Sequence, residues 1–208
     1  MHGYHRAMRL LRAADYRRMP WKNGGGETRE ILVSPPGATL DALDWRISLA
    51  TIASDGPFST FEGIQRTLCV IRGAGIQLQV GNATPELLLE TSSPYTFAGE
   101  AAASSTLVAG ATVDLNVMSR RGRFRHAVRR FAMQARLELQ ATATTTMVFS
   151  QTGSLLCEID GASIRLESED CVVFDHEMLP IALSATGLAN IILIELFEAA
   201  SAPRLLSR

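Results

Sequence analysis

The chain has 208 residues, of which 47% are hydrophobic and 20% are charged, and its formal net charge is −1. This hydrophobic share is typical of a folded globular protein and excludes a disordered chain, while the length allows one large domain or two small ones. The near-zero charge also argues against nucleic acid as the main partner, because phosphate binding normally needs a basic excess.

The sequence predicts neither a transmembrane helix nor a signal peptide. No run of about 18 apolar residues occurs, which argues against a transmembrane helix. The first seven residues lack the apolar core of a signal peptide. We therefore expect a soluble, cytoplasmic protein without a membrane partner, in which Cys69, Cys157 and Cys171 stay reduced.

A short internal repeat is the first sign of architecture. Residues 68–78 and 156–166 are identical at seven of eleven positions, and each copy reads as a strand, a glycine turn and a second strand. This pattern predicts a hairpin in each copy. Cys69 and Cys157 fall at equivalent positions, where we expect small buried core residues rather than redox groups. Two copies of such a unit predict two similar all-β modules, with a boundary within residues 119–125.

Other strand candidates are short apolar or alternating runs separated by Gly, Pro, Asn and Ser. In chain order, the strand candidates are residues 28–34, 45–53, 66–72, 76–80, 112–118, 154–159, 163–166, 171–174 and 189–197. This spacing favours a sandwich or jelly-roll barrel over alternating βαβ units. Residues 127–139 have a helical pattern, although their apolar residues suit a strand as well. Residues 101–105 and 141–146 are expected to be loops.

The most distinctive segment runs from Met19 to Glu30 and contains three consecutive glycines, residues 24–26. Glycines in a row let the backbone turn sharply or approach a ligand closely. The segment is not a phosphate-binding P-loop, because no Gly-Lys-Ser/Thr follows and a strand rather than a helix comes next. It is either an ordinary flexible turn or part of a ligand site, and its density of polar residues favours the site.

Strand alternation places several polar residues on shared faces. These faces carry Thr28 and Glu30 on the first strand, Arg46 and Ser48 on the second, and Asp114, Asn116, Met118 and Arg120 on a later one. If they point into the mouth of one barrel, they form a cleft rich in arginine and amide groups. The fork of an arginine matches a carboxylate, so a small organic acid is the expected ligand. The alternative, that the same faces contact solvent, is equally compatible with alternation alone.

Metal and nucleophile sites lack their usual parts. The four histidines are His2, His5, His126 and His176. Two lie at the terminus, one at the module junction and one beside a strand end, so they do not form the set of two close histidines, a carboxylate and a third histidine that metal-binding β-barrels use, and we predict no bound metal or other cofactor. No Gly-x-Ser-x-Gly elbow occurs. Glu27 and Glu30 could form an acid–base pair, although carboxylates at this spacing are common on protein surfaces.

Six arginines lie between residues 120 and 130. They could form a patch that binds anions or nucleic acid. Because the net charge is close to zero, we favour the interpretation of a solvated linker face. Arg120 is the exception, since its strand phase places it beside Asn116.

Several motifs together resemble the HutD/Ves family. The first is Pro20-Trp-Lys-Asn-Gly-Gly-Gly-Glu-Thr-Arg-Glu-Ile31, and the others are residues 45–48, 54–59, 66–67 and 114–118 with Arg120. They occur in the order of the family, and the resemblance runs from Met8 to about Phe197. Residues 1–7 are expected to be an N-terminal extension. The matched family residues are Trp21, Asn23, Thr28, Glu30, Arg46, Ser48, Asp55, Phe58, Arg66, Asn116 and Arg120.

The resemblance implies an all-β, two-module cupin-like fold, a bicupin of double-stranded β-helix or jelly-roll barrels with little helix. The modules would be residues 8–120 and 121–208. The resemblance also implies an association with bacterial histidine utilisation, in a family without a settled catalytic activity. The matched residues are then the expected ligand-binding residues.

We therefore expect a metal-free binding protein for a small anionic metabolite, linked to the regulation of histidine utilisation. Arg46, Arg66 or Arg120 would hold the acid, and histidine breakdown yields such acids, including urocanate and formylated or formiminated glutamate. One alternative is a metal-independent isomerase or hydrolase with Glu30 and Asp55 as acid and base, and another is a protein-interaction module. A homodimer formed through edge strands is compatible with all three.

Overall fold

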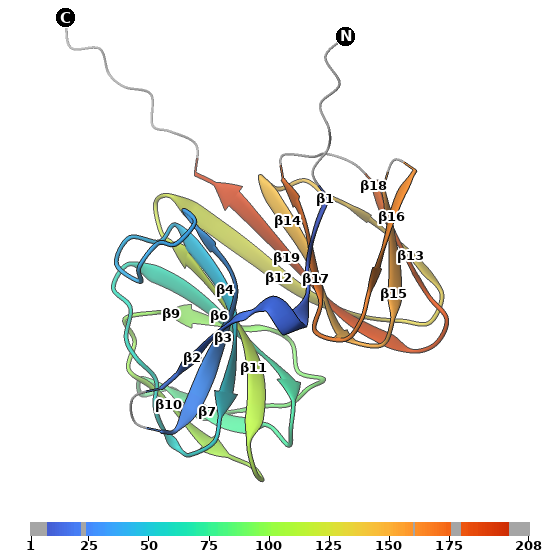
Figure 1. The fold of residues 1–208 in the computed structure, drawn as a ribbon. Helices are drawn as coiled ribbons and strands as arrows, with labels where there is room; N and C mark the ends of the chain where they lie inside the picture. Colours follow the sequence, from blue (N-terminus) through green and yellow to red (C-terminus); the bar gives the residue numbers. More distant parts are fainter. Residues whose placement is uncertain (1–7, 22–23, 160, 176–179, 200–208) are drawn as a thin grey trace, which may run out of the picture.

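The computed structural model describes residues 8–21, 24–159, 161–175 and 180–199. Within these ranges the chain forms nineteen strands and one 3-10 turn, and the strands form four antiparallel sheets (Figure 1). The all-β prediction is confirmed. No helix in these ranges is long and apolar enough to cross a membrane.

The N-terminal half contains a six-stranded and a four-stranded sheet. The six-stranded sheet has the order β2 (Arg17–Pro20), β3 (Gly26–Ser34), β4 (Trp45–Ile52), β11 (Thr112–Arg120), β6 (Ile64–Arg72) and β9 (Tyr95–Ala98). The four-stranded sheet has the order β5 (Gly56–Pro57), β10 (Ala103–Leu107), β7 (Ile76–Val80) and β8 (Glu86–Leu88).

The C-terminal half contains a five-stranded and a four-stranded sheet. The five-stranded sheet has the order β1 (Met8–Leu11), β17 (Cys171–Asp175), β14 (Thr145–Thr152), β19 (Ala189–Glu198) and β12 (Phe124–Met133). The four-stranded sheet has the order β13 (Arg136–Gln140), β18 (Pro180–Ala185), β15 (Leu155–Ile159) and β16 (Ala162–Leu166). β1, blue in Figure 1, therefore lies among the C-terminal strands, although the sequence analysis assigned its residues to the N-terminal module. A 3-10 turn (Ala13–Asp15) leads the chain from β1 back to β2.

The two halves repeat one strand order. The series β4-β11-β6-β9 corresponds to β12-β19-β14-β17, and β5-β10-β7-β8 corresponds to β13-β18-β15-β16. By position in the sheets, the hairpin β15–β16 corresponds to β7–β8. The sequence repeat gives a different correspondence, because residues 156–166 of β15 and β16 are similar to residues 68–78, which lie in β6 and β7. The predicted hairpin is thus confirmed for residues 156–166 and wrong for residues 68–78.

The reason lies in the partners of β6. It pairs with β11 on one side and with β9 on the other, so neither of its edges is available to β7. Gly73 and Gly75, at φ of 108° and 103°, instead carry the chain from one sheet to the other. These φ values favour glycine over residues with a side chain. The glycine turn that the sequence shows is therefore real, but it joins two sheets rather than two paired strands.

The helical interpretation of residues 127–139 is wrong, because this segment forms parts of β12 and β13. Its apolar residues alternate between two cores, with Val128 on one face of the sheet and Phe131 and Met133 on the other. The arginine-rich segment likewise spans the end of β11 and most of β12 rather than a linker. Each of the two expected loops also contains the start of a strand, β10 in one and β14 in the other.

Three apolar clusters hold the sheets together. The central cluster lies between the six-stranded and five-stranded sheets and joins Leu49 and Leu115 of the N-terminal half to Phe149 and Ile192 of the C-terminal half. A second cluster joins the two C-terminal sheets, and a third joins part of the two N-terminal sheets. The central strands are buried on both faces, so their sequences are nearly continuous runs of apolar residues, as in residues 191–194 of β19.

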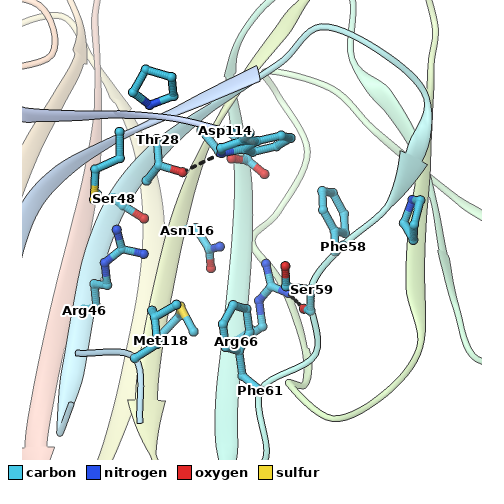
Figure 2. Close-up of a pocket in the computed structure, with 16 residues that line it drawn as sticks. Thr28, Arg46, Ser48, Phe58, Ser59, Phe61, Arg66, Asp114, Asn116 and Met118 are labelled. Carbon is cyan, nitrogen blue, oxygen red and sulfur yellow. Dashed lines mark hydrogen bonds between the residues drawn. The ribbon is translucent and has the colours of Figure 1, made fainter. Parts of the chain in front are cut away.

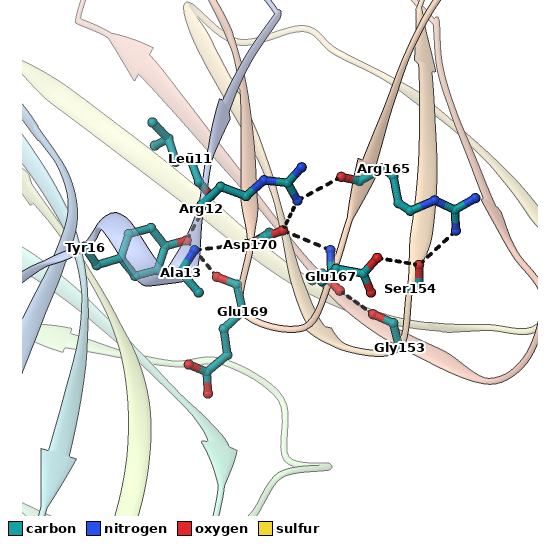
Figure 3. A network of polar contacts seen from close by, with 11 residues as sticks. Leu11, Arg12, Ala13, Tyr16, Gly153, Ser154, Arg165, Glu167, Glu169 and Asp170 are labelled. Atoms are coloured by element: carbon teal, nitrogen blue, oxygen red, sulfur yellow. Dashed lines mark hydrogen bonds and ion pairs between the residues drawn. The ribbon is translucent and has the colours of Figure 1, made fainter.

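A polar network joins the start of the chain to the turn between β16 and β17 (Figure 3). The Asp170 carboxylate accepts hydrogen bonds from Arg12 Nη1 at 2.6 Å and from the backbone N–H of Ala13 at 2.9 Å. The Tyr16 hydroxyl donates to the carbonyl oxygen of Glu169 at 2.7 Å. These contacts fasten the crossover between the halves at the point where the chain passes from β1 to β2.

The side chain of Glu169 extends the same network to the six-stranded sheet. Its carboxylate forms ion pairs with Arg29 on β3, at 2.8 Å, and with Arg72 on β6. Glu169 also has a φ of 69°, a left-handed conformation that residues other than glycine rarely adopt. The ion pairs and the hydrogen bond from Tyr16 hold the turn in this conformation.

Candidate functional site

A cavity of about 520 Å³ opens in the N-terminal half, on the side of the six-stranded sheet that faces away from the central core (Figure 2). Its floor is formed by β4, β11 and β6, and its rim by residues 57–61, β2 and Trp21. Alternation explains why the floor is polar, because Ile47, Leu49 and Leu115 point to the central core and their neighbours in sequence point to the cavity.

Strand register arranges the floor in rows. Met118 on the central strand pairs with Arg46 on one side and Arg66 on the other. Two residues along β11, Asn116 pairs with Ser48. A further two residues along, Asp114 pairs with an alanine of β4, and Figure 2 shows it beyond Asn116. The cavity therefore has a cationic row at one end, an amide and hydroxyl row in the middle and a carboxyl group at the other end.

Arg66 is the buried cation of the cavity, with 3% of its surface exposed. Its guanidinium lies over the rings of Phe58, Phe61 and Phe97, at 5.5, 5.2 and 5.1 Å from their centroids. Nη1 donates to the carbonyl oxygen of Ser59 at 3.2 Å, whereas Nε has no hydrogen-bond partner among the described residues. No carboxylate of the described chain lies within 4.0 Å of it. Burial lowers the pKa of Arg66 to about 10, although the charge of Asp114 acts in the opposite direction.

Asp114 and Asn116 supply buried acceptors. Asp114 is 1% exposed, and Oδ1 of each residue has no hydrogen-bond partner in the part of the chain that the structure describes. Burial raises the pKa of Asp114 to about 7, whereas the charge of Arg66 and backbone N–H groups lower it. Buried polar atoms are nearly always hydrogen-bonded in native proteins, so such atoms gathered in one cavity make it the candidate site.

Two further polar pairs shape the walls. Arg46 Nε donates to Glu30 Oε2 at 2.7 Å, and both side chains are largely buried. Trp21 Nε1 donates to Thr28 Oγ1 at 2.9 Å, which holds the indole at the rim. The charge of Arg46 is thus balanced within the protein, whereas that of Arg66 has no ion-pair partner among the described residues.

The structure brings together most of the predicted ligand-binding residues. Those that line the cavity are Trp21, Thr28, Arg46, Ser48, Phe58, Arg66 and Asn116. Glu30 contacts the site through Arg46. The prediction that the polar strand faces form a cleft is therefore correct for Thr28, Arg46, Ser48 and Asn116. The role of these residues in binding stays a prediction. Asn23 lies outside the described residues.

Asp55 and Arg120 do not line the cavity. The Asp55 carboxylate accepts a hydrogen bond from the backbone N–H of Leu107 at 2.8 Å, and so stabilises a loop. Arg120 has the expected strand phase, but it stands at the end of β11 and donates to the carbonyl oxygens of Leu43 and Asp41, both at 2.8 Å. The proposed acid–base pair of Glu30 and Asp55 is therefore not assembled in one site.

Several lining residues were missing from the prediction. Asp114 and Met118 lie on the same face of β11 as Asn116, and the strand alternation that predicted Asn116 as a site residue predicts them as well. Ser59 and Phe61 lie in an irregular segment, where no periodicity indicates which way a side chain points. The described residues contain no group of three or more His, Cys, Asp or Glu side chains that could hold a metal ion.

Comparison with known proteins identifies the family. The HutD family model matches residues 13–192. The chain belongs to the HutD family. An uncharacterised protein encoded in the hutC 3′ region of Pseudomonas putida is 36% identical over 92% of this chain and 98% of its own length. Protein Ves of Citrobacter koseri is 44% identical over 55% of this chain and 61% of its own length.

Solved structures agree with this assignment. HutD from Pseudomonas fluorescens SBW25 superposes with a TM-score of 0.80 at 34% identity, covering 93% of this chain and 100% of that one. A cupin 2 conserved barrel domain protein from Leptotrichia buccalis has a TM-score of 0.56 at 10% identity, covering 89% and 99%. The second likeness is one of fold alone, and it shows that this HutD-family protein has a cupin-like fold.

Proposed function

We propose that this HutD-family protein binds a small organic acid in its N-terminal cavity and does so without a metal. The observation that supports this most directly is Arg66, a buried guanidinium with an unpartnered Nε and no neighbouring carboxylate among the described residues. A buried charge is costly unless it is paired and hydrogen-bonded. The carboxylate of a ligand would supply both the opposite charge and an acceptor for Nε.

The surroundings of Arg66 favour a planar anion. The rings of Phe58, Phe61 and Phe97 hold the guanidinium in place and shield it from water. Arginine binds carboxylates through two parallel hydrogen bonds when its fork is held in this way. Arg46, on the other side of Met118, offers a second cation whose charge is shared with Glu30.

The names of the relatives favour a link to histidine utilisation. One relative is named for the hutC region and another is named HutD. The breakdown of histidine yields urocanate and N-acylated glutamates, which are carboxylic acids small enough for a cavity of about 520 Å³. We propose such an acid as the ligand, and regulation of histidine utilisation as the role that its binding serves.

We also propose that the two halves are two cupin modules, close to residues 8–120 and 121–208. The repeated strand order supports this division, with β1 exchanged into the C-terminal sheets. The apolar cluster between the two C-terminal sheets fills much of that half, whereas part of the corresponding space in the N-terminal half is a polar cavity. The ligand site would therefore belong to the N-terminal module.

Binding is tested by thermal unfolding with urocanate, N-formylglutamate and the neutral amide of each. A ligand at 100 times its Kd adds roughly 2.7 kcal/mol to the free energy of unfolding. We expect an acid to raise the melting temperature and its amide to have little effect. Arg66→Gln should weaken binding at least tenfold, whereas Arg125→Gln, at an exposed arginine stacked on Phe197, should bind as the wild type does. Equal binding by Arg66→Gln and wild type would contradict the proposal.

A further inference from the structure

Asp114 is the polar group of the cavity that the proposed anion site leaves unexplained. It lies in the middle of β11, the strand that pairs with both β4 and β6, and it is almost fully buried. Backbone N–H groups of Ala50 and of Asp114 itself interact with the carboxyl group, yet Oδ1 has no partner among the described residues. The carboxyl group thus receives backbone hydrogen bonds, but Oδ1 of this lining residue has no donor among the described residues.

The cations of the cavity do not satisfy it either. Arg66 acts on Asp114 through its field, but no ion pair within 4.0 Å joins the two in the described part of the chain. Arg46 is held by Glu30. Met118, which marks the cationic row, lies four residues after Asp114 along β11, or about 14 Å of extended backbone. The acceptor and the cations therefore stand at opposite ends of the floor.

Asn116 lies between these ends and repeats the pattern. Its Oδ1 is also buried and also lacks a partner among the described residues. The cavity thus presents one unsatisfied donor, Nε of Arg66, followed along the floor by two unsatisfied acceptors. A ligand that satisfied the whole series would offer an anionic oxygen at one end and a hydrogen-bond donor at the other.

We propose that Asp114 determines specificity by accepting a hydrogen bond from an N–H or O–H group of an organic acid whose carboxylate binds Arg66. This inference rests on the proposed function and narrows its ligand class to acids that carry a donor remote from the carboxylate. An N–H or O–H suits either protonation state of Asp114, because a protonated carboxyl group keeps an oxygen that accepts. An acid without the donor would leave buried acceptors unsatisfied, and sites of this kind reject such analogues strongly.

The test compares two acids of similar shape by isothermal titration calorimetry. Urocanate carries a ring N–H, whereas 3-(2-furyl)acrylate has a five-membered ring and the same acrylate without that donor. We expect the wild-type protein to bind urocanate at least tenfold more tightly. Asp114→Leu removes the acceptor and should reduce this preference to less than threefold. Asp114→Asn retains one acceptor oxygen and should keep most of it, and thermal unfolding checks that both variants are folded.

The outcomes separate this inference from the proposed function. Equal binding of the two acids by the wild-type protein would overturn the role of Asp114 and leave acid binding intact. A preference that persists in folded Asp114→Leu would overturn it as well. If the wild-type protein bound neither these acids nor N-formylglutamate, the proposed function would fail and this inference with it. If Asp114→Leu does not fold, equal binding of the two acids by the wild-type protein would still overturn the inference.

Discussion

Replacing Asp114 by asparagine should change how the stability of the protein depends on pH. Burial raises the pKa of Asp114 from 3.8 to about 7 in the folded protein. The folded state therefore keeps a proton on this group over a pH range in which the unfolded chain has lost it. The resulting stabilisation is complete below about pH 4 and is lost as the pH rises through about 7.

The size of the effect follows from the two pKa values. The contribution of Asp114 to the free energy of unfolding should fall by about 2 kcal/mol between pH 5 and pH 7. Asp114→Asn cannot titrate and lacks this fall. The free energy of unfolding of the variant minus that of the wild type should therefore rise by about 2 kcal/mol over the same range, because the contributions of the other groups cancel.

His126 provides a control of opposite sign. Its ring nitrogens lie 2.8 Å from Thr67 Oγ1 and 2.7 Å from Ser119 Oγ, and burial lowers its pKa from 6.5 to about 4. The stability contributed by neutral His126 is complete above pH 6.5 and is lost as the pH falls through about 4. For His126→Gln, the difference from wild type should therefore rise as the pH falls.

Urea unfolding at pH 5, 6, 7 and 8 measures both differences. The fluorescence of Trp21 and Trp45, the two tryptophans of the chain, follows the transition. Linear extrapolation then gives the free energy of unfolding at each pH. A difference between Asp114→Asn and wild type that stays constant from pH 5 to pH 8 would refute the argument that burial perturbs this carboxyl group.

Two further predictions concern the backbone. Gly26→Ala should destabilise the protein by about 3 kcal/mol, because the added Cβ would lie 1.9 Å from the carbonyl oxygen of Thr51. Gly56→Ala is the control, since its Cβ would have no atom within 4 Å, and its free energy of unfolding in urea should stay within about 1 kcal/mol of wild type. Glu169→Ala should cost about 3 kcal/mol through the lost ion pairs. Glu169→Asn should cost about 1 kcal/mol less, because asparagine tolerates the left-handed conformation better than glutamate or alanine does. Equal losses for the two Glu169 variants would show that the conformation of the turn contributes nothing.

The alternation of side chains between the two faces of a strand was the most informative signal in the sequence. A strand has only two faces, so the phase of residues 45–53 and 112–120 was sufficient to group Arg46, Ser48 and Asn116. The same local signal predicted the all-β class. It was weakest for residues 127–139, where apolar residues on both faces of β12 resemble a helical pattern.

The residues of the site could be predicted only in part from the sequence. Alternation could not show which face encloses a cavity, because both faces of β4 and β11 are buried. It also placed Arg120 in the site, although the strand ends there and the side chain turns to the carbonyl oxygens of a loop. Asp55 matched a family motif but serves a loop, which only its contact with Leu107 reveals.

The sequence by itself determined the strand class, the polar face of the floor and the family. The tertiary structure decided that the halves share a central core, that β1 crosses to the far sheets, and that the repeated segment joins two sheets in one half. It also decided that Arg66 is surrounded by rings from two segments and that Asp114 is buried without a cation at contact distance in the described chain. Burial and pairing depend on residues far apart along the chain, and local periodicity carries no information about them.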